Sequence, residues 1–454
     1  MRRLFKHLPR FRAARLAMRE LAAREGWHRE RMEAYQLERL NAVWERAFEE
    51  TTHYRALRDR LGLPVRFESL EAFTRLMPVL EKGAVRDAPE RFCSIRAGRD
   101  GGGEWHRTSG SSGSRTSIYY GATAHRETLR AKYRFYQSWG VDFYDRWVFV
   151  WGNAGALAPG IQGLKERVRG PVMDWARGRL RLSPYDLRAS TLRGYLERIA
   201  RFKPRAIYSH SMAAHLLAEE AERMGWQCPS LRLVVLTAEP VRPATVAVVE
   251  RALGVPAVAE YGCTECEFLA GHDGDRRLRV RDDLVFVETL PREDGAYDVV
   301  VSVLGNGDFP LLRYRLGDVC DGPIDRSAVG FAVLPAVRGR DFDLVMDAAG
   351  DAVHGQAFED VVDKYDGVRR WRAEQDESGA VTVWLECHET LGEGLRVAIE
   401  RRLAALVPGF GLVVREVDVL PARPGGKHRT VVSALGRRAV ATPAEANVLE
   451  GVGS

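Results

Sequence analysis

The sequence predicts an α/β fold, with a large multi-subdomain α/β N-terminal domain containing parallel sheets and a small α+β C-terminal domain. Three observations predict it. Apolar residues recur at helical spacing in the first part, short β-rich runs alternate with amphipathic stretches in the middle, and the pattern resets beyond residue 340. Alternating strands and helices indicate parallel sheets, because parallel strands need long crossover connections. The 454 residues suffice for about three structural units.

Residues 1–105 are expected to form a helical region of the large domain. Residues 11–63 are rich in Ala, Leu, Glu and Arg, and apolar residues recur three and four positions apart, as at Leu37, Leu40 and Trp44. Such a stripe is typical of an amphipathic helix that buries one face. We therefore expect a packed helical layer. A peripheral membrane-binding helix in the Arg-rich first turns is the alternative, on composition alone.

Residues 106–337 are expected to hold the nucleotide- and acid-binding part of the large domain. Runs of strand length and composition alternate there with stretches of helical length. The strands are predicted at 147–151, 206–208, 231–236, 257–261, 284–289, 297–303 and 311–316, and two of the helices at 190–201 and 212–224.

Residues 338–454 are expected to form a small mobile C-terminal domain. A proline followed by a Gly-Arg-Asp turn at 335–340 marks the boundary. The remaining part has ordinary domain size, at roughly 110 residues. Its predicted elements are a strand at 381–386, a helix at 391–406, a strand at 412–420, a Pro- and Gly-rich loop at 421–426 and a further short strand.

The composition excludes several classes of protein. With 45% hydrophobic and 29% charged residues, the chain is not mainly disordered. No apolar run approaches the ~20 residues of a membrane-spanning helix, and no signal-peptide core follows the basic start. Six scattered cysteines indicate reduced thiols in a cytoplasmic protein. The net charge of +6 suits an anionic substrate, and we expect no nucleic-acid partner.

Residues 107–116 are rich in hydroxyls and glycine. Gly110 and Gly113 allow the backbone to turn tightly and to point several N–H groups at one anion. Arg115 adds a fork suited to phosphate. Further donors come from the hydroxyls of Thr108, Ser109, Ser111 and Ser112. No Gly-Lys-Ser/Thr ends the loop, so it is not a Walker loop. The pattern indicates a phosphate-binding loop, and a flexible Ser/Gly surface loop is the alternative.

This loop resembles that of the adenylate-forming acid ligases, and four further segments match that family in order. Residues 260–265 are similar to its Tyr-Gly-x-Thr-Glu segment, 312–318 to its Tyr-Arg-x-Gly-Asp segment, 339–343 to its hinge motif and 421–429 to the loop bearing its catalytic lysine. Within the superfamily the chain resembles the phenylacetate–CoA ligase family, above all its capsule-polysaccharide-biosynthesis branch, at residues 151–152, 163–167, 183–187 and 236–240. The resemblance covers most of the chain from about residue 40 onward.

The resemblance implies an ATP-dependent ligase. A carboxylic acid would be adenylated to acyl-AMP with release of pyrophosphate, and the acyl group would then pass to an acceptor, expected to be coenzyme A. ATP, Mg²⁺ and coenzyme A are the implied cofactors, a small carboxylic acid and ATP are the partners, and a homodimer is compatible with it. Because two anions must meet, positive charge and a divalent metal must screen their repulsion.

The resemblance also implies a role for each matching residue. Thr264 would hydrogen-bond the α-phosphate, and Glu265 would help to ligate Mg²⁺, a hard cation that prefers carboxylate oxygen. The other phosphates would bind Thr108, Ser109, Gly110, Ser111, Ser112, Gly113 and Arg115, the adenine would contact Ala238, Glu239, Pro240, Tyr261 and Gly262, and the ribose would bind Asp318, with Arg340 reaching ribose or phosphate from the domain junction.

Lys427 is the predicted catalytic lysine. Lysine supplies only 7 of the 68 basic residues, so a lysine directly after Gly425-Gly426 stands out from the arginine background. A compact ammonium on a flexible stem can reach the α-phosphate and carboxylate oxygens of the adenylation transition state. The alternative is an ordinary surface lysine.

Two positions depart from the family pattern. Many relatives have lysine where Ser114 stands, so Arg115 is expected to substitute for it. The hinge motif usually has successive acidic residues, whereas Phe342 separates Asp341 from Asp343. The residue about which the C-terminal domain rotates is therefore left open.

Cysteine and histidine residues lie near the predicted nucleotide site. Cys263 and Cys266 form a Cys-x-x-Cys, His272 follows, and Cys320 comes soon after the predicted ribose residue. A structural zinc ion uses such ligands. Two close cysteines without a second pair are a weak zinc signal, so the favoured interpretation is isolated thiols packed near the nucleotide.

The acyl pocket and the acceptor stay open. Trp151, Tyr208, His210 and Met212 fall near strand ends, where α/β sheets bind ligands, but they suit a core equally well. The capsule resemblance suggests a sugar or amine acceptor as an alternative, and stable nucleotidyl transfer to a phosphate-bearing acceptor is another. A catalytically inactive nucleotide-binding homologue is the third alternative. Its weakness is that a pure binding protein has no need of an α-phosphate lysine.

Overall fold

The structure of the chain, a computed structural model, has the predicted α/β fold class. It describes residues 9–99, 101–107, 116–142, 144–151, 174, 177–184, 187–239, 241–293, 295–326, 329–337, 344–346, 352–354, 358, 361–362, 365, 367–387, 389–406, 411–420 and 431–433.

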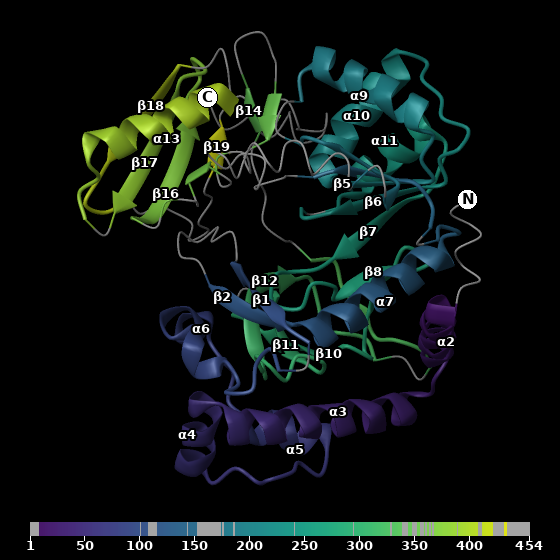
Figure 1. The fold of residues 1–454 in the computed structure, drawn as a ribbon, viewed down its shortest axis with the longest axis vertical. Coiled ribbons are helices and arrows are strands. Elements are labelled where there is room, and N and C mark those ends of the chain that lie inside the picture. The colour runs from purple at the N-terminus through teal and green to yellow at the C-terminus, as the bar shows by residue number, and fades with distance from the viewer. Residues whose placement is uncertain are drawn as a thin grey trace.

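The N-terminal region is helical, as its apolar spacing predicts. Its elements are α2 (Pro9–Arg24), α3 (Arg29–Glu50), α4 (Thr52–Leu61), α5 (Leu70–Leu76), α6 (Lys82–Asp87) and the 3₁₀ helix η1 (Pro89–Phe92). The α3 helix buries Leu40, Val43, Trp44 and Ala47 along one stripe. Side-chain caps start two of the helices, since the Thr51 hydroxyl accepts from Tyr54 N and the Ser69 hydroxyl from Ala72 N, and these caps fix where the chain turns. In Figure 1, α3, α4 and α5 form the lowest layer of the molecule.

An eight-stranded sheet is the largest in the part of the chain that the structure describes. Its strands lie in the order β13-β9-β8-β7-β6-β5-β3-β4. Neighbours from β4 to β7 are parallel, and those from β7 to β13 are antiparallel. The strands are β3 (Trp147–Val150), β4 (Arg179–Leu182), β5 (Ala206–His210), β6 (Leu233–Thr237), β7 (Ala257–Tyr261), β8 (Ala270–His272), β9 (Leu278–Val280) and β13 (Val333–Leu334).

Helices cover both faces of this sheet. On one face Ile207 and Val234 join the core formed with α9 (Ala189–Phe202), α10 (Ser211–Arg223) and α11 (Pro243–Leu253). On the other face Val235 and Val258 join a core that includes Phe135 of α7 (Ala122–Ser138). Figure 1 shows α9, α10 and α11 above the sheet and α7 below it. Because side chains alternate along a strand, neighbouring residues of β5, β6 and β7 belong to different cores.

A three-stranded antiparallel sheet lies below α7 in Figure 1. It consists of β10 (Val285–Pro291), β11 (Tyr297–Val303) and β12 (Tyr314–Cys320). The predicted strand at 311–316 is wrong in its position, because Arg313 has a φ of 50° and the strand begins only at the next residue. Leu311 and Leu312 are fully buried without belonging to a strand. Their apolar character reflects burial rather than ladder pairing.

Near the phosphate-loop residues, β1 (Gly103–Arg107) and β2 (Ser117–Gly121) form an antiparallel pair, and Arg107 lies opposite Ser117. The pairing brings Arg107 and Ser117, which flank the predicted phosphate loop, next to each other, and residues 108–115 themselves lie outside the described residues. The β2 strand leads directly into α7, so the β1–β2 pair is fixed to the helix that covers one face of the large sheet.

The C-terminal part has its own core. Its strands are β14 (Leu344–Met346), β15 (Ala352–His354), β16 (Val368–Gln375), β17 (Val381–Cys387), β18 (Leu412–Glu416) and β19 (Val431–Ser433), and its helix is α13 (Glu393–Leu406). The four-stranded sheet has the order β18-β17-β16-β19 and mixes parallel with antiparallel pairs. The buried residues of this core all lie between 345 and 431. Figure 1 shows this sheet apart from the eight-stranded one.

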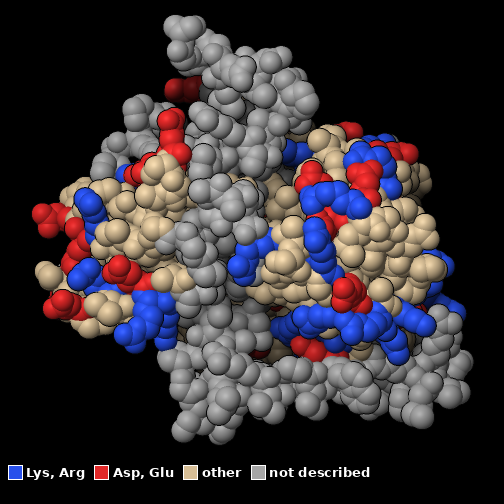
Figure 2. All heavy atoms as spheres, turned by 90° about the horizontal axis from the view of Figure 1, so that it is seen from above, with Lys and Arg blue, Asp and Glu red and all other residues tan. Residues whose placement is uncertain are grey.

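The surface above α9, α10 and α11 is charged with both signs, as Figure 2 shows. Arg193 Nε lies 2.6 Å from a Glu220 oxygen, and Arg251 Nε lies 2.8 Å from Glu222. Both side chains of the Arg251–Glu222 pair are exposed, so this pair contributes little to stability, whereas the Glu220 side chain is buried. Among the described helices, none combines the length and the apolar character that crossing a membrane requires.

Candidate active site

A cavity of about 1030 Å³ lies where parallel strands β5, β6 and β7 end. Ligands of open α/β sheets bind at this edge. Residues that are widely separated in the sequence line it, including Lys82, Lys132, Trp151, Tyr208, Thr237, Ala238, Glu239, Glu260, Tyr261, Gly262, Cys263, Thr264, Glu265, Glu267, His272, Leu316 and Asp318. The cavity therefore brings together the predicted adenine, ribose, phosphate and magnesium residues that the structure describes.

Tyr261 and Asp318 meet although they come from different sheets. The Tyr261 hydroxyl donates to Asp318 Oδ2 over 2.7 Å, which joins the end of β7 to β12. Burial, followed by the nearby Asp318 charge, raises the pKa of Tyr261 well above its ordinary value. The phenol therefore stays protonated and serves as a donor. The two residues predicted to hold adenine and ribose thus form one fixed unit.

Gly262 is required by a close backbone approach. A Cβ at this position would lie 2.2 Å from the carbonyl oxygen of Glu267, a distance that no side chain tolerates. The chain turns tightly here, since Glu267 N donates to Cys263 O over 2.7 Å and Glu267 has a φ of 55°. The sequence predicts that Gly262 contacts adenine. The tight turn is a second reason why glycine is needed at this position.

Glu265 is buried on this turn and paired with a lysine that sequence reasoning missed. Lys82 Nζ lies 3.4 Å from Glu265 Oε1, and the Tyr314 hydroxyl donates to the same oxygen over 3.2 Å. A backbone bridge places this lysine, because Leu80 N donates to Arg313 O and Arg315 N donates to Leu80 O. In the sequence, Lys82 could have been noticed only as one of the few lysines in an arginine-rich chain, which is a weak indication of a functional residue.

The donor set at Glu265 fits a magnesium ion that is bound together with phosphates. Glu265 offers carboxylate oxygens and the neighbouring Thr264 a hydroxyl, and both line the cavity. Magnesium prefers oxygen ligands and usually takes one or two carboxylates plus substrate phosphates. Among the residues that the structure describes, no group of three or more His, Cys, Asp or Glu is arranged to hold a metal by itself. The fit is therefore to a metal–nucleotide complex.

Ala238 and Glu239 line the cavity after β6. Ala238 has a φ of 68°, so the backbone bends sharply at the strand end. Glu239 Oε2 accepts from Met212 N over 2.7 Å at the start of α10, and a carboxylate is favourable at a helix N-terminus. Glu239 thus holds a helix start beside the cavity as well as lining it.

The suggested acyl-pocket residues divide into two groups. Trp151 and Tyr208 line the cavity, with ring centroids 5.3 Å apart. His210 packs behind Trp151 at 4.5 Å and is buried, and Met212 contributes its backbone N–H to the Glu239 bond. Lys132 and Glu260, which sequence reasoning did not assign, join the first two at the wall of the cavity.

The cysteines and His272 are not assembled as ligands of one metal. Cys263 Sγ and Cys266 Sγ lie 3.2 Å apart, but His272 Nδ1 accepts from Ala259 N over 3.1 Å and Cys320 Sγ contacts Gly322 O. Burial and then Arg276 lower the pKa of His272 to about 4, so its ring is neutral near pH 7. The imidazole nitrogen that faces Ala259 therefore acts as a structural acceptor.

Several predicted residues lie outside the described residues, and their assignments stay predictions. They are Thr108, Ser109, Gly110, Ser111, Ser112, Gly113, Ser114, Arg115, Pro240, Arg340, Asp341, Phe342, Asp343 and Lys427.

No protein-family model and no curated protein matches this chain. Solved structures do match it. A 2-hydroxyisobutyryl-CoA ligase in complex with 2-HIB-AMP and CoA, in its thioesterification state, has 17% identity and a TM-score of 0.61, with 94% of each chain covered. The same ligase in its postadenylation state with 2-HIB-AMP has 17% identity and a TM-score of 0.56, with 94% of this chain and 93% of that chain covered. The chain therefore shares the fold of this ligase over nearly its whole length.

Proposed function

We propose that the chain is an AMP-forming acid ligase of the adenylate-forming superfamily, similar to the phenylacetate–CoA ligase family. It adenylates a small carboxylic acid with release of pyrophosphate and transfers the acyl group to coenzyme A. The observation that carries this proposal is the convergence of Tyr261, Glu265 and Asp318 on one cavity at the carboxyl ends of parallel strands. The fold shared with 2-hydroxyisobutyryl-CoA ligase supports it.

Nucleotide binding uses the fixed Tyr261–Asp318 unit. The Tyr261 ring offers an aromatic face to adenine, and the Asp318 carboxylate accepts hydrogen bonds from the ribose hydroxyls. Because the 2.7 Å hydrogen bond between them already orients both side chains, less conformational entropy is lost when the nucleotide binds.

In the first chemical step, an oxygen of the acid attacks the α-phosphorus and the bond from this phosphorus to the pyrophosphate oxygen breaks. Positioning and charge supply most of such catalysis. Glu265 would hold Mg²⁺, which when bound neutralises phosphate charge, and Thr264 would hydrogen-bond the α-phosphate. Lys82, 3.4 Å from Glu265, adds a further positive charge beside the reacting anions.

Residues 338–454 act as the mobile domain, after the helical region 1–105 and the binding region 106–337. A core formed only by residues 345–431 supports this division. Rotation of this domain brings Lys427 to the α-phosphate, where its ammonium stabilises charge in the transition state. Arg340, as the resemblance implies, would reach the ribose or a phosphate from the domain junction.

Coenzyme A is the acceptor that we favour. The matched ligase structure holds both an acyl-AMP and CoA, which supports this order of steps. A sugar or amine acceptor, as the capsule resemblance suggests, keeps the first step and changes only the second.

The test is a pyrophosphate-release assay over a panel of carboxylic acids with ATP and Mg²⁺. Release that depends on one acid, with AMP appearing when coenzyme A is added, supports the proposal. Lys427→Ala should lower the rate of pyrophosphate release about 100- to 1,000-fold, the usual loss when one group that stabilises transition-state charge is removed. Lys203→Ala, at an exposed position at the end of α9, is the matched control and should stay near the wild-type rate.

Two results would contradict the proposal. No release with any acid would end the ligase assignment, and wild-type rates in the Lys427→Ala variant would remove this lysine from the mechanism. AMP formation with amines or sugars but not with coenzyme A would replace the acceptor.

A further inference from the structure

Lys132 places a buried ammonium in the wall of the cavity. Its Nζ lies 2.8 Å from Glu260 Oε1, and the exposed fractions of the two side chains are 20% and 1%. The lysine comes from α7, which covers one face of the sheet, and Glu260 comes from the end of β7. Because Lys132 lines the cavity, its exposed fifth is turned toward the space where a ligand binds.

Glu260 does not depend on Lys132 alone. The Tyr136 hydroxyl donates to Glu260 Oε2 over 2.5 Å, and the Tyr208 hydroxyl donates to Oε1 over 2.9 Å. Burial, followed by the Glu260 charge, raises the pKa of both phenols, so both stay protonated donors. A carboxylate with three donors is well satisfied.

Lys132 by contrast has donor capacity left. An ammonium carries three N–H groups. Among the described residues, Glu260 is the hydrogen-bonding partner of Lys132, and the Tyr208 ring lies 5.7 Å from its Nζ. The protein has already removed most of the water from this ammonium. An acceptor atom on a ligand can therefore bind it at little further desolvation cost, whereas a hydrocarbon would leave buried N–H groups without a partner.

The charges around Lys132 narrow the class of ligand. Glu260 neutralises the ammonium, and Glu267, which also lines the cavity, adds negative charge near Lys132. A second carboxylate on the ligand would lie close to Glu260 and be repelled. A neutral oxygen takes the free N–H groups without this repulsion. The Trp151 and Tyr208 rings, 5.3 Å apart on the same wall, supply apolar contact for the carbon skeleton.

We propose that Lys132 selects acids whose acyl part carries a neutral hydrogen-bond-accepting oxygen, such as a hydroxyl, ether or carbonyl group. This inference rests on the proposed function, because it assigns the substrate class of the same cavity. Lys132 is a specificity residue that touches the acyl part and takes no part in bond breaking.

The experiment compares matched acids in the pyrophosphate-release assay. The pairs are benzoate with 4-hydroxybenzoate, phenylacetate with 4-hydroxyphenylacetate and butyrate with 3-hydroxybutyrate, and terephthalate tests the second carboxylate. In the wild type, kcat/KM for the best oxygen-bearing acid should exceed that for its plain partner by about 10-fold or more, and terephthalate should be poor. Lys132→Met should bring this ratio close to one, because it removes a donor that only the oxygen-bearing acid uses.

Arg130→Met is the matched control, since it removes a cation from an exposed position of the same helix and should keep the ratio. Lys132→Arg retains charged donors and should keep a preference for the oxygen-bearing acid. A ratio near one in the wild type overturns the inference, and so does a Lys132→Met variant that slows both acids equally, as a purely structural role would do. If Lys132→Met fails to fold, the wild-type ratios and the Lys132→Arg variant decide. Absence of release with every acid overturns the proposed function itself, a result distinct from release without preference.

Discussion

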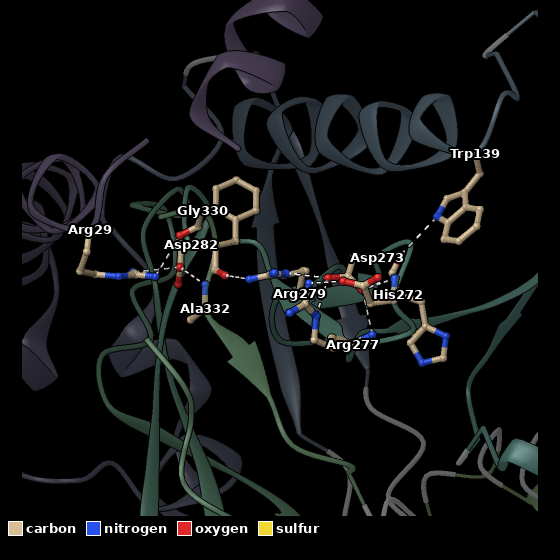
Figure 3. Close-up of polar contacts among 11 residues, drawn as sticks. Arg29, Trp139, His272, Asp273, Arg277, Arg279, Asp282, Gly330 and Ala332 are labelled. Atoms are coloured by element: carbon tan, nitrogen blue, oxygen red, sulfur yellow. Dashed lines mark hydrogen bonds and ion pairs between the residues drawn. The ribbon is translucent and has the colours of Figure 1, made fainter. Parts of the chain in front are cut away.

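Two charged clusters of this molecule lie on β7–β9 and the segments beside them, and they differ in what surrounds them. In the first, shown in Figure 3, Asp282 lies between α3 and the turn at residue 330. Arg29 lies 3.1 Å from Asp282 Oδ2 and also donates to Gly330 O over 3.0 Å, while Ala332 N donates to Asp282 over 2.7 Å and Gln36 Nε2 donates to the Asp282 carbonyl over 2.9 Å. The Asp282 side chain is fully buried. In this cluster the hydrogen-bonding capacity of Asp282 is taken up by donors of the protein itself.

The second cluster surrounds the cavity. Lys82 pairs with Glu265, and Lys132 pairs with Glu260, but the two lysine side chains keep 23% and 20% of their surface exposed. Both lysines line the cavity. The difference indicates that the Asp282 cluster stabilises the fold, whereas the cavity cluster keeps charge available for a ligand. Changes in the first should lower stability, and changes in the second should lower activity.

The largest effect is expected from Asp282→Ala. This change leaves the Arg29 guanidinium, the Ala332 N–H and the Gln36 amide short of a carboxylate acceptor in a buried region. Orphaned buried donors cost about 1–3 kcal/mol each, and relaxation recovers part, so the free energy of unfolding should fall by about 3 kcal/mol or more. Chemical denaturation measures it.

Asp275→Ala is the control for this prediction. Asp275 pairs with Arg277 in the same region, but its side chain is 74% exposed. Its removal should change the free energy of unfolding by no more than about 0.5 kcal/mol. Equal effects of the two substitutions would show that burial does not separate these pairs.

The next effect is expected from Glu265→Gln, and it concerns activity. The amide keeps the size of the side chain but weakens it as a magnesium ligand, so kcat/KM for pyrophosphate release should fall about 100-fold. This corresponds to about 2.7 kcal/mol of transition-state stabilisation. The midpoint of chemical denaturation should stay close to that of the wild type, because Tyr314 can still donate to the amide oxygen.

Glu222→Gln on the exposed face of α10 is the control for the assay, since Glu222 is exposed and pairs with the exposed Arg251. A Glu265→Gln variant with wild-type kcat/KM at limiting Mg²⁺ would contradict the metal assignment. A variant that loses stability and activity together would place Glu265 in the same class as Asp282.

The strand and helix order of the large sheet could be predicted from the sequence, because it follows from local patterns. The runs at 206–208, 231–236 and 257–261 are apolar and β-branched, and β5, β6 and β7 lie over them. The strand predicted at 311–316 failed because the local pattern does not reveal the conformation of Arg313. Its guanidinium is bound to Glu288 and to the carbonyl of Met77, which are distant in sequence, and the chain turns to allow this.

The site could be predicted only where its residues belong to ordered motifs. Tyr261, Glu265 and Asp318 lie in such segments, and all three line the cavity. Lys82 and Lys132 do not, since they come from α6 and α7, and their carboxylate partners lie on or after β7. Lys82 and Glu265 are 183 positions apart, and a pairing over that distance depends on the packed fold rather than on spacing.

The smallest effect near neutral pH is expected at His272 on β8. Figure 3 shows Trp139 donating to the His272 carbonyl. His272 also lines the cavity. Burial and Arg276 lower the pKa of His272 to about 4, whereas an unfolded histidine has a pKa of about 6.5. Protonation would also turn its Nδ1, the acceptor for Ala259 N, into a donor facing a donor.

The sign of the pH dependence follows from proton binding. Below about pH 6.5 the unfolded state binds a proton at this residue that the folded state does not, so stability falls as the pH falls from about 6.5 to about 4, and this contribution is absent above that range. His53, whose pKa is also lowered to about 4, acts in the same direction.

His272→Asn keeps an acceptor for Ala259 N and cannot be protonated. The variant should therefore lose stability less steeply than the wild type, by about 1 kcal/mol per pH unit between pH 6 and 4.5, in denaturation curves measured across that range. His53→Asn gives an independent measure of the same size for the other histidine. Equal slopes for the wild type and His272→Asn would mean that the His272 ring accepts a proton in the folded state. The ring would then not be the structural acceptor for Ala259 N that the folded chain shows.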